Sequence, residues 1–285
     1  MNKLKKVGLT ALAGTLVALS AAQAGGVSVN GTMELSYTKL DSKKVTGNPL
    51  GQKKNITFSG GGEFANGWTF GILHVQNDAM SGLSSSSMTI GMGALGSVSY
   101  DSGTGGYGLN AIDNVVPIAF EEADYGMPTG MVDAGTTVSN TGSLHWKAPE
   151  LMPGLAIELG WTPRGGQAAV SDGGSGGEGG SERGWEATAQ WSPEMLPGLK
   201  VGGGIGELEE GGTTHGKDLE EQTFFATYAF GPLSVGYQIA EEDDNGSTQY
   251  TTDIYGASFN INDVFSVSYQ YGETEYDNTG STTDV

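Results

Sequence analysis

The sequence of 285 residues contains no cysteine, which excludes a disulfide framework and any metal site built on thiolates. Beyond the N-terminal segment it has no run of about twenty apolar residues, so a bundle of membrane-spanning helices is excluded. Basic residues are few, with 13 Lys and Arg against 33 Asp and Glu, and the formal net charge is -20. This excess of acid opposes binding to nucleic acid and favours a solvated surface that attracts cations.

The segment 1–24 is expected to be a cleaved signal peptide and not part of the fold. Three lysines among the first six residues precede an apolar stretch, and Ala22-Gln23-Ala24 supplies the small residues of a cleavage site. The alternative is an uncleaved N-terminal anchor, for which the apolar stretch is short. An exported chain without cysteine fits the envelope of a Gram-negative cell.

Most of residues 25–285 alternates between apolar and polar residues with a period of two, as a β-strand does when its two faces meet different surroundings. We predict thirteen such strands, the first within Val27–Leu40. The connections between them also alternate. Long polar connections lie at 41–50, 77–86, 101–140, 163–182, 207–218, 241–248 and after Gly272; short turns lie at 65–67, 93–96, 149–154, 193–198, 231–232 and 261–263.

This strict alternation predicts an all-β fold, a transmembrane antiparallel up-and-down β-barrel with short turns at one end and long loops at the other. A soluble sandwich with Greek-key crossovers has no reason to maintain it. The apolar residues of each strand would face lipid and the polar residues would enclose water. Aromatic residues near strand ends fit the girdles expected at the two membrane interfaces: Trp68, Trp146, Trp161, Trp191, Tyr228 and Phe230.

The longest connection, 101–140, is far longer than an ordinary loop, and loops of this length are usually functional. Its apolar stretch 115–120 can pack against a wall, whereas four acids would remain in water: Asp113, Glu121, Glu122 and Asp124. The alternative is that these acids only keep an external loop soluble.

Three short motifs, together with the signal peptide and the alternation of connections, give the chain a resemblance to the general porins of Gram-negative outer membranes, especially those of alphaproteobacterial type. The motifs are Gly26–Gly31, Ala65–Phe70 and Asn110–Pro117. The resemblance covers residues 25–285 and implies a channel for passive diffusion of small hydrophilic solutes and ions. It also implies a homotrimer and an inward-folded loop, here 101–140, that constricts the pore.

The resemblance further implies that acids of the loop oppose basic residues on the barrel wall. The basic residues whose strand position points to the interior are Lys53, His145, Lys147 and Lys200. Opposed charges of this kind set a transverse field and a size limit for polar solutes. Since acids predominate, we expect the channel to favour cations.

No enzyme activity is expected, because no nucleophile and base are found together with the acids. The glycine motif 103–108 lacks the following helix that a dinucleotide site requires. No cofactor or metal is expected: the histidines are scattered, and the glycine-rich acidic stretch 172–182 lacks the nonapeptide period of a calcium repeat. The alternative function is a secreted or surface-exposed acidic binding protein, adhesin-like or lectin-like.

The porins that the chain resembles close a barrel of sixteen strands. Thirteen strands cannot close an up-and-down barrel, because the first and the last would run parallel. The sequence is therefore expected to lack about three C-terminal strands.

Overall fold

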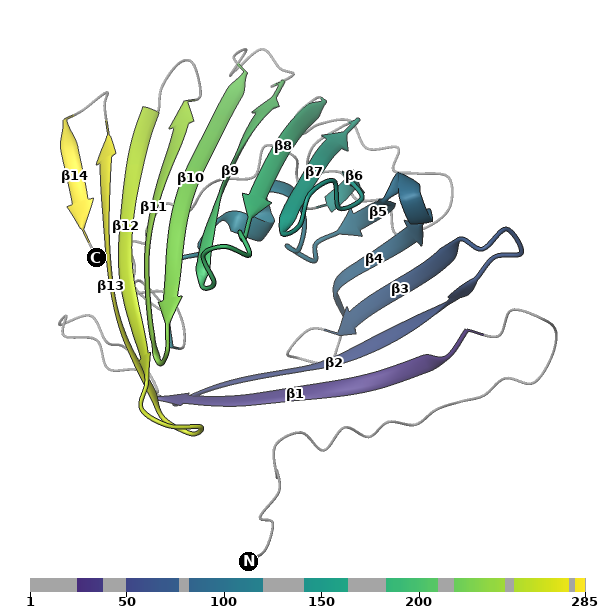
Figure 1. The fold of residues 1–285 in the computed structure, drawn as a ribbon, viewed down its shortest axis with the longest axis horizontal. Helices are drawn as coiled ribbons and strands as arrows, with labels where there is room; N and C mark the ends of the chain where they lie inside the picture. Colours follow the sequence, from purple (N-terminus) through teal and green to yellow (C-terminus); the bar gives the residue numbers. More distant parts are fainter. Residues whose placement is uncertain are drawn as a thin grey trace, which may run out of the picture. The chain divides into compact units, whose positions relative to one another are not determined.

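The computed structural model describes residues 25–37, 50–76, 82–119, 141–163, 183–209, 218–243, 249–276 and 280–284. The predicted signal peptide, 1–24, lies outside these residues. The chain divides into two compact units, Met1–Gly93 and Ala94–Val285. Each unit contains antiparallel strands whose order in the sheet is their order in the sequence (Figure 1).

The described residues of the first unit form four strands: β1 (Val27–Tyr37), β2 (Leu50–Glu63), β3 (Thr69–Gln76) and β4 (Leu83–Gly91). The hairpin between β2 and β3 turns at Asn66, whose Oδ1 accepts a hydrogen bond from Trp68 N at 3.1 Å. Gly67 has a φ of 83°, a conformation that glycine adopts without strain. The predicted Asn-Gly turn is confirmed.

The described residues of the second unit form ten strands and one short helix, and the chain position at which the two units divide falls within a further 3-10 turn, η1 (Gly93–Leu95). The short helix is η2 (Gly108–Ile112), also of 3-10 type. The strands are β5 (Ser97–Ser102), β6 (Thr141–Lys147), β7 (Leu155–Thr162), β8 (Gly184–Trp191), β9 (Leu199–Leu208), β10 (Leu219–Phe230), β11 (Leu233–Asp243), β12 (Gln249–Asn260), β13 (Ser266–Tyr276) and β14 (Ser281–Asp284).

The thirteen predicted strands are confirmed, and β14 is an additional short strand that pairs with β13. Several predicted boundaries are wrong: β5, β9 and β11 end at Ser102, Leu208 and Asp243, inside predicted connections, and the two largest differences lie at β4 and β13. β4 begins at Leu83, inside the predicted connection 77–86, and β13 continues to Tyr276, beyond the predicted end at Gly272. Within each unit every strand pairs with its sequence neighbours, which excludes the Greek-key alternative. Among the described residues, no helix is long and apolar enough to cross a membrane.

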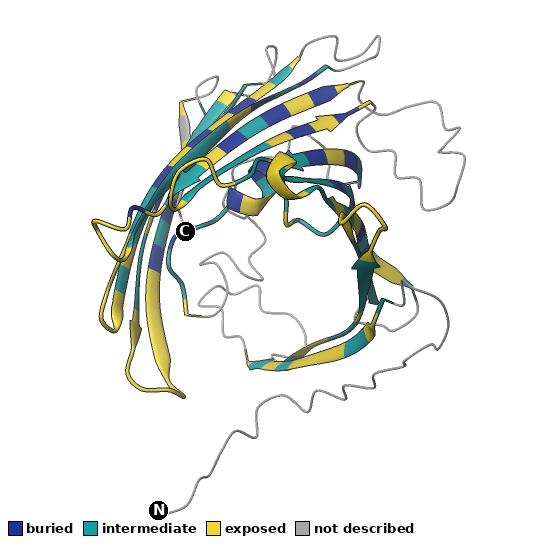
Figure 2. Cartoon of the chain, turned by 45° about the vertical axis from the view of Figure 1, so that its right-hand side comes forward, coloured by how far each residue is buried: buried dark blue, intermediate teal, exposed yellow. Residues whose placement is uncertain are grey.

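The two faces of the strands differ as the alternation predicts (Figure 2). In the second unit, Trp185 is 43% exposed and the next residue, Glu186, is 2% exposed; Phe224 and Phe225 show the same contrast, at 53% and 0%. Large apolar side chains therefore cover the exposed face of the sheet, whereas the polar face is partly buried. A soluble binding protein would bury Phe265 in a dry core, yet this side chain is 65% exposed.

Candidate functional site

The described part of the long connection, residues 103–119, lies against the polar face of the second unit. We call it the loop segment. Its helix η2 contacts β7, β8 and β9 (Figure 1). Its later residues contact β11 and β12, through hydrogen bonds to Gln238 and packing against Ile254. The segment thus crosses several strands on the face opposite to the exposed apolar side chains.

Apolar side chains attach the loop segment to this face. Leu109 and Ile112 are buried against Phe225 of β10, with Val115 packed beside them. Val116, 2% exposed, forms a second buried pair with Ile254 of β12. Both buried apolar clusters found among the described residues include the loop segment, so hydrophobic burial stabilises the loop–sheet contact.

Three glycines on the polar face make room for these side chains. We call Gly204, Gly236 and Gly256 the contact glycines. A Cβ atom on Gly204 would lie 2.7 Å from Leu109 Cδ2, and one on Gly236 would lie 2.5 Å from Pro117 Cδ. A Cβ atom on Gly256 would overlap Val116 Cγ1. Since Gly236 and Gly256 are direct cross-strand partners, they form one continuous hollow beneath residues 116–117.

Gln238 of β11 holds the backbone of the loop segment at two points. Its Oε1 accepts a hydrogen bond from Val115 N at 3.0 Å, and its Nε2 donates to Ile112 O at 2.7 Å. The same Nε2 donates to Thr223 Oγ1 at 3.0 Å, which fixes the orientation of the amide. The side chain is fully buried. It supplies the donor and the acceptor that an adjacent strand would otherwise supply to these backbone groups.

The start of η2 lies over a buried cluster of acids and one histidine. Glu158 Oε1 accepts a hydrogen bond from Gly108 N at 2.8 Å. His145 Nδ1 lies 3.3 Å from that oxygen and 3.6 Å from Glu186 Oε1. The imidazole is 3% exposed and stacks with the ring of Tyr107, at 5.0 Å between centroids. This cluster fixes the entry of the loop segment onto the sheet.

Replacing Gly108 by alanine is expected to disturb this entry. Gly108 has a φ of 59°, and a Cβ atom there would overlap Glu186 Oε1. The left-handed conformation alone costs a non-glycine residue about 1–2 kcal/mol. We expect unfolding in urea, followed by fluorescence in detergent micelles, to show a stability loss of at least this size. Gly67→Ala, with nothing within 4 Å of the added atom, separates the conformational cost from the overlap. Equal losses in the two variants would contradict the role of Glu186.

The predicted site residues occupy different environments. Asp113 is half-buried at the end of η2, and its Oδ1 accepts a hydrogen bond from Asn114 N at 2.7 Å. Glu121, Glu122 and Asp124 lie outside the described residues.

Of the predicted basic wall, Lys147 is exposed at the end of β6, and Lys200 Nζ lies 5.6 Å from the centre of the Phe225 ring. Lys53 is exposed in the first unit, opposite Glu34 in the register. His145 is buried beneath Tyr107 and beside two acids, so in this conformation it lies under the loop segment and not on an open wall. The sequence interpretation did not identify Gln238 or the contact glycines. Glycine recurs at the strand positions of β9, β11 and β12 that face the polar side, and this recurrence is the signal that could have indicated the contact glycines.

The sequence matches the family model of the Gram-negative porins over residues 8–285. No curated protein matches the chain. Solved structures with a similar fold include an anion-selective porin from Comamonas acidovorans, 16% identical, with a TM-score of 0.58 over 91% of this chain and 82% of that one. OmpF of Salmonella typhi, solved in complex with daunomycin, is 12% identical, with a TM-score of 0.62 over 92% of this chain and 83% of that one. At these identities the structures demonstrate the shared fold.

Proposed function

Because the chain belongs to the Gram-negative porin family, and is thus an outer-membrane channel and not an enzyme, we propose that residues 101–140 form its constriction. The observation that carries the proposal is the attachment of the loop segment to the polar face of the sheet by Gln238 and by two apolar clusters. In an up-and-down transmembrane barrel the polar face encloses the aqueous lumen. A loop fixed to that face occupies part of the lumen and sets its narrowest point.

We propose that small hydrophilic solutes and ions diffuse passively through this channel and that cations are favoured. Support for the preference comes from charge. Three acids lie on the polar face of the second unit near the loop segment (Asp101, Glu158 and Glu186), and the formal charge of the chain is -20. The anion-selective porin of similar fold indicates that selectivity depends on the particular side chains. The predicted pairing of loop acids with Lys147 and Lys200 stays part of the proposal, as does a homotrimeric assembly.

Conductance across a planar lipid bilayer tests this proposal. In a KCl gradient the wild-type reversal potential is expected to show that the channel prefers potassium to chloride. Removing acidic charge from the loop should shift this potential toward zero. Two variants remove that charge: Asp113→Asn, and the double variant Glu121→Gln with Glu122→Gln. Opposed charges at a narrow pore act strongly on permeating ions because little water screens them.

A matched control is Glu194→Gln, which removes an exposed acid from the turn between β8 and β9, at the opposite end of these strands from loop 163–182. This variant is expected to keep the wild-type reversal potential. Absence of channels in the wild type would refute the channel function. Active channels whose selectivity is unchanged by the loop variants would refute the assignment of the constriction acids. Chemical crosslinking in detergent tests the trimer separately.

A further inference from the structure

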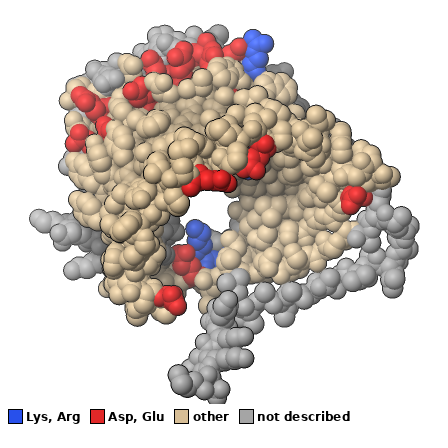
Figure 3. Space-filling model, viewed as in Figure 1, with Lys and Arg blue, Asp and Glu red and all other residues tan. Residues whose placement is uncertain are grey.

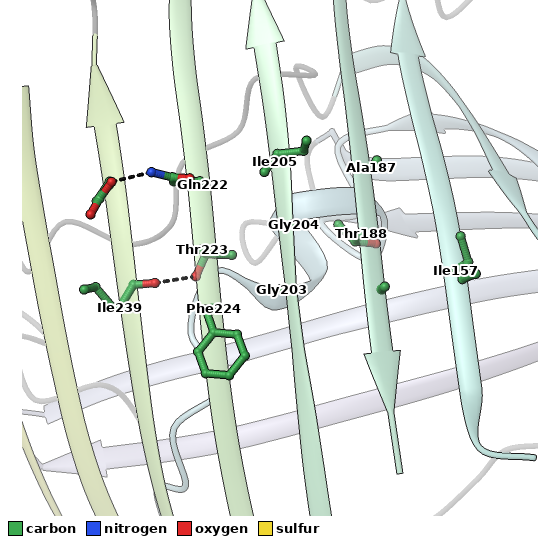
Figure 4. A pocket seen from close by; sticks show the side chains of 12 residues that line it. Ile157, Ala187, Thr188, Gly203, Gly204, Ile205, Gln222, Thr223, Phe224 and Ile239 are labelled. Carbon is green, nitrogen blue, oxygen red and sulfur yellow. Dashed lines mark hydrogen bonds between the residues drawn. The ribbon is translucent and has the colours of Figure 1, made fainter. Parts of the chain in front are cut away.

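The exposed apolar face of the second unit is hollowed where side chains become small on β8 and β9. One row of direct cross-strand partners shows the change: Ile157, Ala189, Gly203, Phe224 and Ile239, on β7 to β11. The hollow measures about 510 Å³, and Figure 4 shows Ile157, Ile205, Phe224 and Ile239 around it. This volume lies within the range of roughly 300–1,000 Å³ found for small-molecule sites.

The floor of the hollow is fixed by close packing of the backbone. A Cβ atom on Gly203 would overlap the carbonyl oxygen of Thr223 and would lie 3.3 Å from Phe224 Cα. On the neighbouring strand, Ala187 and Ala189 contribute only methyl groups. No larger side chain fits at Gly203 without moving β9 away from β10. The hollow is therefore a property of the strand pairing and not of a side-chain rotamer.

An acidic hollow of about 530 Å³ adjoins one end of this apolar hollow. The two hollows share Ile205, Gln222 and Glu241 as lining residues, and we call them together the groove. The acidic end lies where β9 ends and β10 begins, and Figure 3 shows acidic side chains gathered along this end of the second unit. Its acidic lining residues on the lipid-facing side are Glu207, Glu220, Glu241 and Asp243, and Glu221 and Glu242, which have the parity of the polar face, border it at the strand ends.

Few basic groups balance these acids in the part of the chain that the structure describes. Trp185 Nε1 donates to Glu207 Oε2 at 3.1 Å, and Gln222 donates to Glu241, but both donors are neutral. Arg183 pairs with Glu209 at 2.7 Å, and neither residue lines the groove. The groove thus combines an apolar floor with a strongly negative end.

We propose that this groove binds an amphiphile with one alkyl chain and a cationic headgroup. The apolar face is the lipid-facing side of the barrel, so an alkyl chain can enter the hollow over Gly203 from the membrane. The acidic end then lies where the long loops begin, at the level of the headgroups, and charge complementarity selects a cation there. The inference rests on the orientation of the strands in the membrane and does not depend on the constriction.

Electron spin resonance of spin-labelled amphiphiles tests the proposal in vesicles of phosphatidylcholine that contain the full chain. A spin-labelled alkyltrimethylammonium is expected to show a motionally restricted population several-fold larger than that of a spin-labelled alkyl sulfate of the same length. Ala187→Phe should abolish this preference, because the new ring fills the hollow on the lipid-facing side. The double variant Glu207→Gln with Glu241→Gln should reduce it and leave alkyl-chain contact intact.

Ala257→Phe is the matched control, since Ala257 pairs with Val235 on the same face and does not line the groove. It is expected to retain the wild-type preference. Equal restriction of both amphiphiles would overturn the proposal, and so would preference for the sulfate in the presence of calcium. Loss of the oligomer in Ala187→Phe alone would also overturn it, because the groove would then be an interface between copies. Bilayer conductance of the same variants reports independently on the channel.

Discussion

Gln238→Leu is expected to detach the loop segment from the sheet while the strands remain paired. Leucine has nearly the same volume but offers neither donor nor acceptor, so Ile112 O and Val115 N lose their partners. Leaving two such groups without partners costs about 2–6 kcal/mol in total, at 1–3 kcal/mol each. The strands keep their own ladders, so opening of the segment is the cheaper response.

Hydrogen exchange followed by mass spectrometry measures this opening directly. Peptides covering residues 107–119 should exchange roughly tenfold faster or more in Gln238→Leu, since each 1.4 kcal/mol corresponds to a factor of ten. Peptides from β10 and β12 should keep their protection. Gln222→Leu provides the control, because Gln222 lies on the opposite face of the adjacent strand and bonds to Glu241. Unchanged exchange in Gln238→Leu would show that the apolar clusters suffice to hold the segment.

Alternation of residues was sufficient to predict the strands because each strand faces lipid on one side and water or polar groups on the other. Trp185, Ala187 and Ala189 on one parity, with Glu186 and Thr188 on the other, give β8 unambiguously. The ends of strands were less predictable. β4 begins with Leu83 followed by four serines, and such a run has neither the apolar residues nor the alternation that indicates a strand. The pairing of β3 with β4 determines that boundary.

The contact between loop and sheet could be predicted only in part. The apolar stretch of the loop indicated packing, and Val116 is indeed buried, but Leu109 and Ile112 were not identified as anchors because glycines and polar residues surround them in the sequence. Their partner Phe225 is an apolar residue on a polar parity, next to the lipid-facing Phe224. Its role depends on which loop residue lies above it, and this is a tertiary property.

Gln238 and His145 show the same limit from the polar side. A buried glutamine on a strand is an ordinary member of the polar parity until the backbone of residues 112–115 is placed against it. His145 has the parity of a wall residue, yet Tyr107 and two acids surround it. Parity determines the face on which a side chain lies. It does not determine whether the loop covers that side chain.

Gly256→Val, alone or with Gly236→Val, is expected to displace residues 116–117 from the sheet. The added side chain at Gly256 would occupy the space of Val116 Cγ1 and approach Pro117 O, which lies 3.2 Å from the position of its Cβ. Gly256 cannot retreat, because β12 is paired on both sides by β11 and β13. Overpacking of this kind costs about 1–3 kcal/mol at each site. The loop segment must therefore move, although Gln238 still offers it both a hydrogen-bond donor and an acceptor.

Single-channel recordings and limited proteolysis distinguish this displacement from unfolding. We expect folded channels whose conductance differs from that of the wild type, with faster cleavage within residues 107–119. Gly71→Val is the matched control: Gly71 is also a strand glycine, and an added Cβ would have Gly60 O as its nearest neighbour, at 4.0 Å. Wild-type conductance in Gly256→Val, together with faster cleavage, would mean that residues 116–117 do not border the ion path. A changed conductance with unchanged cleavage would instead assign the effect to the new side chain and not to movement of the loop segment.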